Sequence, residues 1–243
     1  MFTYDCEPTV DSTLIVKFAD DTTVSGLIKN DDETKYRSEV EAVVSWCETN
    51  DLMLNVSKTK EIVIDFRKDQ NIKEPLIIGG QIVEQVDNFK FLGSYISEDL
   101  KWNINCMNII KKARQRMYFL RVLKSFRVRK QIFISFYRAI IESILTNSIT
   151  VWFSAAANKD IKRMNSIVRA AEKVIGVGLP SLESIYNNRI KNKVENILRE
   201  VHHPAHELFQ MLPSKRRLRS FRGKTRFLNS LFPSAVRIFN NRY

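Results

Sequence analysis

Two adjacent acidic residues, Asp20 and Asp21, lie between two apolar, β-branched runs in the stretch LIVKFADDTTVSGLI (residues 14–28). Adjacent carboxylates cannot be buried unpaired within a strand, so the pattern predicts a hairpin that carries both acids at its tip. Carboxylate oxygens suit Mg²⁺, which usually keeps waters and substrate phosphates in its shell. The alternative is a solvated turn, where Asp is common, and a bare Asp–Asp pair usually belongs to such a turn.

Basic residues form the second group that could do chemistry. Residues 1–100 hold 10 Lys+Arg and 20 Asp+Glu, whereas residues 101–243 hold 29 Lys+Arg and 7 Asp+Glu. A positive field of this size attracts polyanions, of which nucleic acid is the first candidate. The alternative is a generic basic surface, but the interleaved aromatic residues favour nucleic acid. The residues expected to contact phosphates are Lys111, Lys112, Arg114, Arg116, Arg121, Lys124, Arg127, Arg129 and Lys130.

The elements that must position these residues indicate an α+β fold. Within residues 1–100, β-rich runs flank the acidic pair, a helix is expected around 36–47, and strands are expected over 61–66 and 89–96. A hairpin is expected at Gly79-Gly80. From about residue 101 the apolar spacing becomes helical, including one continuous helix over 130–153. We therefore predict three parts: 1–100, a helical domain over 101–200, and a basic tail over 201–243.

The chain shows no targeting or membrane pattern. Its three widely spaced cysteines (Cys6, Cys47 and Cys106) exclude a CxxC zinc site and indicate reduced thiols without a disulfide partner. The N-terminal residues lack the features of a signal peptide, and no run approaches about 18 uncharged apolar residues. We expect an intracellular protein without membrane contact. The compartment within the cell and the oligomeric state stay open.

Several motifs, in order along the chain, resemble the reverse transcriptases of non-LTR (LINE-type) retrotransposons. FADD (18–21) resembles their catalytic box, WCETNDLMLNVSKTKEIVIDF (46–66) the segment that follows it, and FKFLGSYISEDLKW (89–102) their primer-grip segment. The segments KKARQRMYFLRVLKSF and FYRAIIESILTNSITVWF resemble the thumb, and HPAHELFQMLPSKRRLRS the tail. The resemblance implies a partial polymerase palm, a helical thumb and RNA-directed DNA polymerisation with Mg²⁺.

The resemblance also assigns roles to single residues. Asp20 and Asp21 match the catalytic, metal-binding pair, and Lys58 or Lys60 falls where a cation can neutralise the leaving pyrophosphate. The primer grip corresponds to Phe91, Leu92 and Gly93. The implied partner is RNA or an RNA–DNA hybrid, with aromatic residues such as Phe221 and Phe227 available for stacking on bases.

One expected element of that family does not match. Its first catalytic aspartate lies on an earlier strand, many residues before the FADD box. Asp5 and Asp11 are too close in sequence to Asp20 to reach the tip from a separate strand. We therefore expect an incomplete Mg²⁺ site and a remnant that binds nucleic acid but is inactive by itself.

Two other interpretations compete with this one. Residues 105–150 also resemble the segment classified as the N-terminal domain of the eighth AlkB homologue, a tRNA-modifying hydroxylase and methyltransferase. Iron/2-oxoglutarate chemistry requires an HxD pair, and none of His202, His203 and His206 precedes an Asp by two residues. The other rival is a nucleic-acid-binding or scaffolding module without catalysis.

Overall fold

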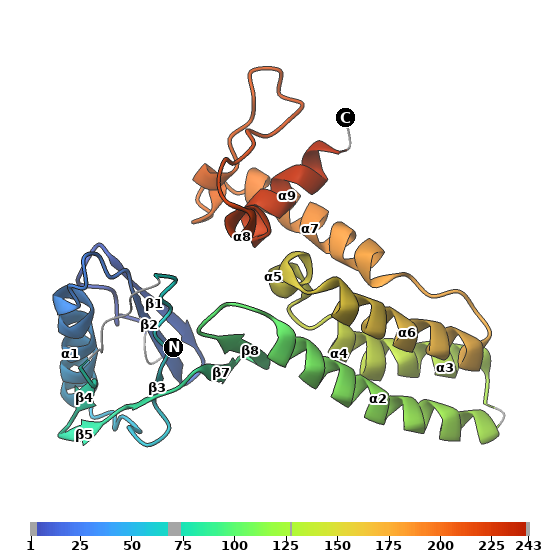
Figure 1. The fold of residues 1–243 in the computed structure, drawn as a ribbon, viewed down its shortest axis with the longest axis horizontal. Coiled ribbons are helices and arrows are strands. Elements are labelled where there is room, and N and C mark those ends of the chain that lie inside the picture. The colour runs from blue at the N-terminus through green and yellow to red at the C-terminus, as the bar shows by residue number, and fades with distance from the viewer. Residues whose placement is uncertain (1–3, 68–73, 127, 242–243) are drawn as a thin grey trace. The chain divides into compact units, whose positions relative to one another are not determined.

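The chain forms two compact units, Met1–Phe89 and Lys90–Tyr243 (Figure 1). The computed structural model describes residues 4–67, 74–126 and 128–241. The expected boundaries at residues 100 and 200 differ from this division. Phe209, Leu218 and Val236 are buried in the core of the second unit, so the segment from residue 201 is packed against the helices and is not a separate tail.

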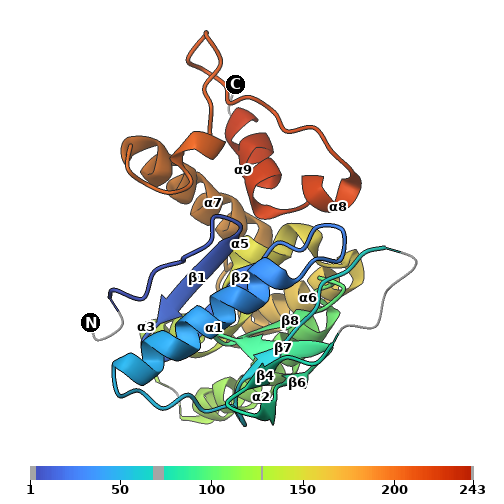
Figure 2. The ribbon, with the colours of Figure 1, turned by 90° about the vertical axis from the view of Figure 1, so that its left-hand side faces the viewer.

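The first unit is built around the acidic hairpin and one helix. Strands β1 (Thr13–Phe18) and β2 (Asp21–Gly26) pair antiparallel, with Phe18 opposite Asp21. Helix α1 (Thr34–Thr49) lies along both strands, as Figure 2 shows. Its residues Val43 and Cys47 pack with Ile15 of β1 and Val24 of β2. The expected hairpin and helix are therefore both present.

The rest of the first unit contains shorter strands than expected. Strand β3 (Lys60–Glu61) pairs parallel with β6 (Glu84–Gln85). The prediction of a strand over 61–66 is therefore wrong beyond residue 61. There the chain is held in an irregular path because the Arg67 guanidinium donates hydrogen bonds to both Asp31 and Asp65. Strands β4 (Ile77–Ile78) and β5 (Gln81–Ile82) form the expected hairpin.

The segment expected as one strand over 89–96 is a hairpin. Strands β7 (Asn88–Phe91) and β8 (Ser94–Ser97) pair with each other across the two-residue turn Leu92-Gly93. Gly93 has φ 87°, a value that glycine reaches without steric cost, and it allows the chain to reverse. The Tyr95 backbone N–H donates to Asn105 Oδ1 at 3.1 Å, which fixes β8 to the first helix of the second unit.

After β8, the described elements of the second unit are helices and helical turns that surround one apolar core. Its most buried side chains include Leu120, Ile141, Trp152, Met164 and Ile190, each 0% exposed. In chain order the elements are α2 (Asn103–Ser125), α3 (Lys130–Phe136), the π-helical turn η1 (Tyr137–Glu142), α4 (Ser143–Leu145), α5 (Ile149–Trp152), the 3₁₀ turn η2 (Phe153–Ala155), α6 (Asn158–Ile175), α7 (Leu182–Arg199), the 3₁₀ turn η3 (His206–Leu208), α8 (Thr225–Leu228) and α9 (Leu231–Asn240).

The continuous helix expected over 130–153 is interrupted between α4 and α5. Ser148 has φ 46°, outside the right-handed helical region. Arg189 of α7 stabilises the break by donating to the Thr146 carbonyl at 2.6 Å and to Thr146 Oγ1 at 2.8 Å. Apolar periodicity does not reveal such a break because its polar partner lies in a distant helix.

The run Lys130–Ala155 is long and apolar enough, by length and composition, to cross a membrane. It contains Arg138 and Glu142. Its residues Tyr137, Ile141 and Leu145 are 0% exposed and belong to the core of the second unit. Core helices satisfy the same length and composition test, so this run is weak evidence for a membrane span.

Candidate functional site

The acidic pair lies at the end of the β1–β2 hairpin. Ala19 and Asp20 form the turn, and Asp21 is the first residue of β2. Both carboxylates are exposed, and no ion pair or side-chain hydrogen bond of either occurs within the described residues. Both are thus free to bind an external cation.

The turn that carries Asp20 is strained at the residue before it. Ala19 has φ 55°, in the left-handed region where an L-residue other than glycine costs about 1–2 kcal/mol. Strained backbone is often found at functional sites, where the surrounding structure enforces it. Here the strands on both sides of the turn enforce it, because Phe18 and Asp21 are paired across the hairpin.

This strain gives a direct prediction. Ala19→Gly is expected to stabilise the first unit by about 1 kcal/mol because glycine tolerates positive φ. Urea unfolding of the full chain, followed by hydrogen exchange in β1 and β2, measures the change. The matched control is Ala42→Gly within α1, which should destabilise the unit by about 0.5–1 kcal/mol. A destabilising effect of Ala19→Gly would contradict the strained turn.

The face that Asp21 shares with β1 is apolar and exposed. Cross-strand partners lie on the same face of a hairpin, so Asp21 lies beside Phe18, in line with Val16 and Leu14. Their side chains are 59%, 40% and 57% exposed. Ile15 and Val24, on the opposite face, pack against α1. The acids therefore border an uncovered apolar surface.

The two carboxylates fit part of a magnesium site. Mg²⁺ is often held by one or two carboxylates, with water and phosphate oxygens completing its shell. Asp20 and Asp21 can supply those two carboxylates. Over the described ranges 4–67, 74–126 and 128–241, no group of three or more His, Cys, Asp or Glu side chains is arranged to hold a metal ion.

The two candidate lysines lie in and just after the turn that leads into β3. The Lys60 ammonium donates to Glu84 on β6 and to the Ser57 carbonyl. Glu84 would therefore compete with pyrophosphate for this ammonium group. The Lys58 side chain is exposed, and its backbone N–H donates to Asn55 Oδ1 at 3.1 Å. Lys58 is therefore the more available cation of the two.

The residues matched to a primer grip form the β7–β8 turn. Phe91 ends β7, while Leu92 and Gly93 have φ 44° and 87°. Two-residue turns with both φ values positive favour Asn-Gly, so leucine in the first position is costly. Leu92 is nevertheless 42% exposed at this tip. The turn thus presents an apolar side chain from a strained backbone.

Helix α2 carries most of the expected phosphate contacts. Its sequence contains six Lys and Arg residues and no Asp or Glu. All six are exposed, whereas Cys106, Ala113 and Leu120 on the opposite face are 0% exposed. Arg129 and Lys130, at the start of α3, are also exposed, and Arg127 lies outside the described residues. The exposed basic residues of α2 are Lys111, Lys112, Arg114, Arg116, Arg121 and Lys124.

Exposed aromatic rings accompany this basic face. Tyr118 and Phe119 are 62% and 47% exposed and contact each other edge to face, with ring centroids 5.5 Å apart. The Arg116 guanidinium lies over the Phe119 ring, 5.8 Å from its centroid. Tyr118 and Phe119 do not belong to the apolar stripe of Ala113, Met117 and Leu120. Their positions relative to this stripe could have identified them from the sequence as exposed.

The two aromatic residues expected to stack on bases differ in their exposure. Phe221 packs against the core of the second unit and contacts Phe227 edge to face, with ring centroids 5.8 Å apart. Phe227 also lies against Gly223, whose missing side chain makes room for its ring. Phe227 nevertheless stays 45% exposed, close to the 47% of Phe119, so Phe227, Tyr118 and Phe119 are all candidates for stacking.

Glu39 of α1 is a structural residue that the sequence analysis missed. Its side chain is fully buried, and its carboxylate accepts hydrogen bonds from the Thr9 and Val10 backbone N–H groups and from Thr13 Oγ1, at 2.7–3.1 Å. Burial alone would raise the pKa of Glu39, but these hydrogen bonds outweigh it and hold the pKa below its usual value. Glu39 thus anchors the segment that leads into β1 and the acidic tip.

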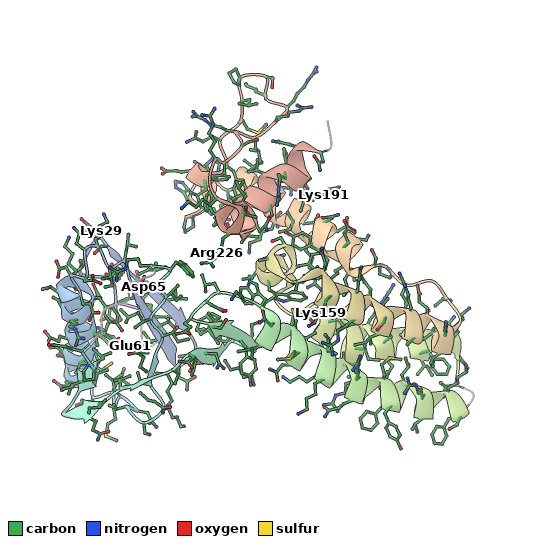
Figure 3. The ribbon with its side chains drawn as sticks, viewed as in Figure 1. Lys29, Glu61, Asp65, Lys159, Lys191 and Arg226 are labelled. Atoms are coloured by element: carbon green, nitrogen blue, oxygen red, sulfur yellow. The ribbon has the colours of Figure 1, made fainter. Side chains whose placement is uncertain are left out.

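Two other acids of the first unit, Glu61 and Asp65, are labelled in Figure 3. Glu61 accepts a hydrogen bond from the Tyr36 hydroxyl at 3.1 Å, and burial raises the pKa of this carboxyl. Asp65 is bound by Arg67, whose hydrogen bonds lower the pKa of Asp65. Both acids therefore serve internal contacts, unlike Asp20 and Asp21.

Comparison with known proteins identifies one matching segment. Residues 102–143 match the family model for the N-terminal part of alkylated DNA repair protein AlkB homolog 8. This segment spans α2, α3, the π-helical turn and the first residue of α4, and it confirms the second of the two expected resemblances. Searches of curated proteins and of solved structures find no match. The reverse-transcriptase resemblance stays a prediction.

Proposed function

We propose that this chain binds RNA or an RNA–DNA hybrid through the exposed face of α2, as the palm and thumb remnant of a non-LTR retrotransposon reverse transcriptase. The observation that carries the proposal is the acid-free face of α2, with six exposed basic side chains and two exposed aromatic rings. A polyanion with accessible bases is the ligand that this combination suits best.

The dimensions of α2 support a multi-phosphate contact. Lys111 and Arg121 share one side of the helix and lie 10 residues apart, which corresponds to about 15 Å along the helix axis. Neighbouring phosphates of one strand are spaced closely enough for several to lie along that length. The helical backbone holds the basic groups at fixed positions on the exposed surface of α2, so little order has to be gained on binding.

The hairpins of the chain support the polymerase part of the proposal. Asp20 and Asp21 would supply carboxylate ligands to Mg²⁺, which would neutralise phosphate charge when bound. The Leu92-Gly93 turn would contact the end of a primer strand. The tips of the two hairpins contain Ala19 and Leu92, non-glycine residues in the left-handed region. Such strain is expected where a backbone shape is kept at the expense of stability.

A second candidate function rests on the family match over residues 102–143. The family description concerns repair of alkylated DNA, and this wording supports nucleic acid as the ligand of the segment that contains α2. Three ligands in a His/Asp arrangement are required for the iron chemistry of 2-oxoglutarate hydroxylases, and the histidines of this chain lack the HxD spacing. Binding of nucleic acid is therefore common to both candidates, whereas hydroxylation is not.

Two assays on the full chain separate the candidates. We expect fluorescence anisotropy to show binding of a labelled RNA–DNA hybrid that weakens steeply between low and moderate salt. We expect no strand extension with primer, template, Mg²⁺ and nucleotides, because Asp20 and Asp21 supply only part of a two-metal ligand set. Iron-dependent turnover of 2-oxoglutarate would support the second candidate, and salt-insensitive binding would contradict the first.

A further inference from the structure

The segment between α7 and α8 contains a short hairpin, which we call the arginine hairpin (residues 210–219). Met211 and Leu218 form an antiparallel bridge. On either side of it the Arg219 N–H donates to the Gln210 carbonyl at 2.7 Å, and the Leu212 N–H donates to the Arg217 carbonyl at 2.8 Å. The hairpin reverses near Lys215, which has φ 54°. This basic segment is thus an ordered element with paired backbone groups.

A side-chain amide fixes the arginine hairpin to the last helix. The Leu218 N–H donates to Asn240 Oδ1 at 2.8 Å, and the Leu218 carbonyl accepts from Asn240 Nδ2 at 2.9 Å. The Leu218 side chain is 1% exposed within the core of the second unit. Asn240 therefore replaces a strand neighbour at this point and holds the backbone of the hairpin against α9.

This attachment determines which side chains face solvent. Residues on either side of a strand position point to the opposite face, so Arg217 and Arg219 point away from the core that receives Leu218. Residues 213–226 contain seven basic residues and no acid, and all seven are exposed. They are Lys215, Arg216, Arg217, Arg219, Arg222, Lys224 and Arg226. Figure 1 shows this loop projecting beyond α8 and α9, and Figure 3 shows nitrogen-tipped side chains along it.

We propose that the arginine hairpin, with Arg222 and Lys224 beside it, is a second nucleic-acid site that binds the backbone phosphates of RNA. Five of the seven basic residues are arginines. The planar guanidinium group donates two parallel hydrogen bonds to a phosphate, which an ammonium group cannot do. A hairpin fixed by Asn240 presents these groups in a constant arrangement, and this reduces the ordering cost of binding. The site lies on different elements from α2 and needs no contribution from it.

The test compares three variants of the full chain for binding to a fluorescein-labelled single-stranded RNA by anisotropy. Arg219→Ala/Arg222→Ala removes two guanidinium groups, and we expect about a tenfold weaker Kd and a salt slope smaller by about 1.4. Lys159→Ala/Lys162→Ala removes the same charge from exposed positions of α6 and should change the Kd less than twofold. Equal losses in these two variants would show a general charge effect and overturn the proposal.

The third variant, Asn240→Ala, keeps every charge and removes both hydrogen bonds to Leu218. We expect it to weaken RNA binding severalfold and to speed hydrogen exchange of the Leu218 amide, while circular dichroism keeps the helical content. Unchanged RNA affinity together with fast exchange at Leu218 would overturn the role of the fixed hairpin. If Asn240→Ala unfolds the unit, the Arg219/Arg222 comparison decides alone.

Two further measurements separate this site from its alternatives. Sedimentation with phosphatidylserine vesicles tests a lipid partner, and loss of vesicle binding without loss of RNA binding in the Arg219/Arg222 variant would overturn the RNA assignment. Variants of α2 test the proposed function instead. If an α2 variant keeps normal RNA affinity while the Arg219/Arg222 variant loses affinity, the result would contradict the α2 site and would support the site on the arginine hairpin.

Discussion

Glu39→Ala is expected to destabilise the first unit by about 3 kcal/mol. The substitution removes a fully buried carboxylate and leaves the N–H groups of Thr9 and Val10 and the Thr13 hydroxyl without their acceptor. Losing the acceptor of buried charge-assisted hydrogen bonds costs several kcal/mol. Hydrogen exchange of residues 9–18 and of α1 measures the loss, while α6 in the second unit should stay unchanged.

The matched control is Glu41→Ala, which removes an exposed glutamate from the same helix and should change stability by less than about 0.5 kcal/mol. Acidification gives an independent check. The folded-state pKa of Glu39 is lowered, so its stabilising contribution is present above the unfolded pKa of about 4.3 and is lost as the pH falls through the folded value. The difference in stability between wild-type and Glu39→Ala protein should thus become smaller at low pH. A constant difference down to strongly acidic pH would contradict this role.

Lys111→Ala/Arg114→Ala/Arg121→Ala should lower the affinity for single-stranded RNA about a hundredfold near physiological salt. Each lost phosphate contact removes about 0.7 from the slope of log K against log salt, so the slope should fall by about 2. The three side chains are exposed on α2, and their removal leaves its buried face unchanged. Anisotropy titrations of the full chain over a range of salt concentrations measure both quantities.

An α6 variant provides the control for net charge. Lys159→Ala/Lys162→Ala/Lys173→Ala removes three exposed positive charges from another helix of the same unit. It should lose less than threefold in affinity if the α2 face is the binding surface. Equal losses in the two triple variants would mean that the field of the whole unit, and not a located site, attracts the RNA.

Local patterns in the sequence predicted those elements whose causes are also local. The Asp20/Asp21 turn and the Gly79-Gly80 hairpin both follow from neighbouring residues. The ends of two helices in the structure have equally local causes. Gly176, with φ 76°, ends α6, and Ser181 Oγ accepts from the Ser184 N–H at the start of α7. Such signals need only a few adjacent residues, because turns and caps are decided within one turn of chain.

The elements that were missed depend on partners far along the chain. The break after α4 is bound by Arg189, and the strand expected over 61–66 is replaced by the contacts of Arg67 with Asp31 and Asp65. The anchoring role of Glu39 depends on a segment 26–30 residues away. A pattern of single residues predicts that a charged residue on a helix faces solvent. Glu39, however, lies on the same face of α1 as Tyr36 and Val43, and its place on that apolar face could have indicated burial.

The sequence predicted which residues of the candidate site are exposed better than it predicted their individual side-chain contacts. The basic residues of α2 are exposed as expected, whereas the partner of Lys60 and the mutual contact of Phe221 with Phe227 could not be inferred from spacing. Side-chain pairs of this kind are set by tertiary packing. The arginine hairpin was seen only as a basic tail because its fixation depends on one amide, Asn240, 22 residues beyond Leu218.

Photo-crosslinking of the full chain to 4-thiouridine-labelled RNA tests the central claim most directly. Mass spectrometry of the crosslinked peptides reports which residues lie against bases. Binding through α2 predicts that crosslinks concentrate at Tyr118 and Phe119, the exposed rings beside its basic face, and that excess unlabelled RNA removes them. Specific RNA crosslinks that leave the α2 peptides unmodified would contradict it.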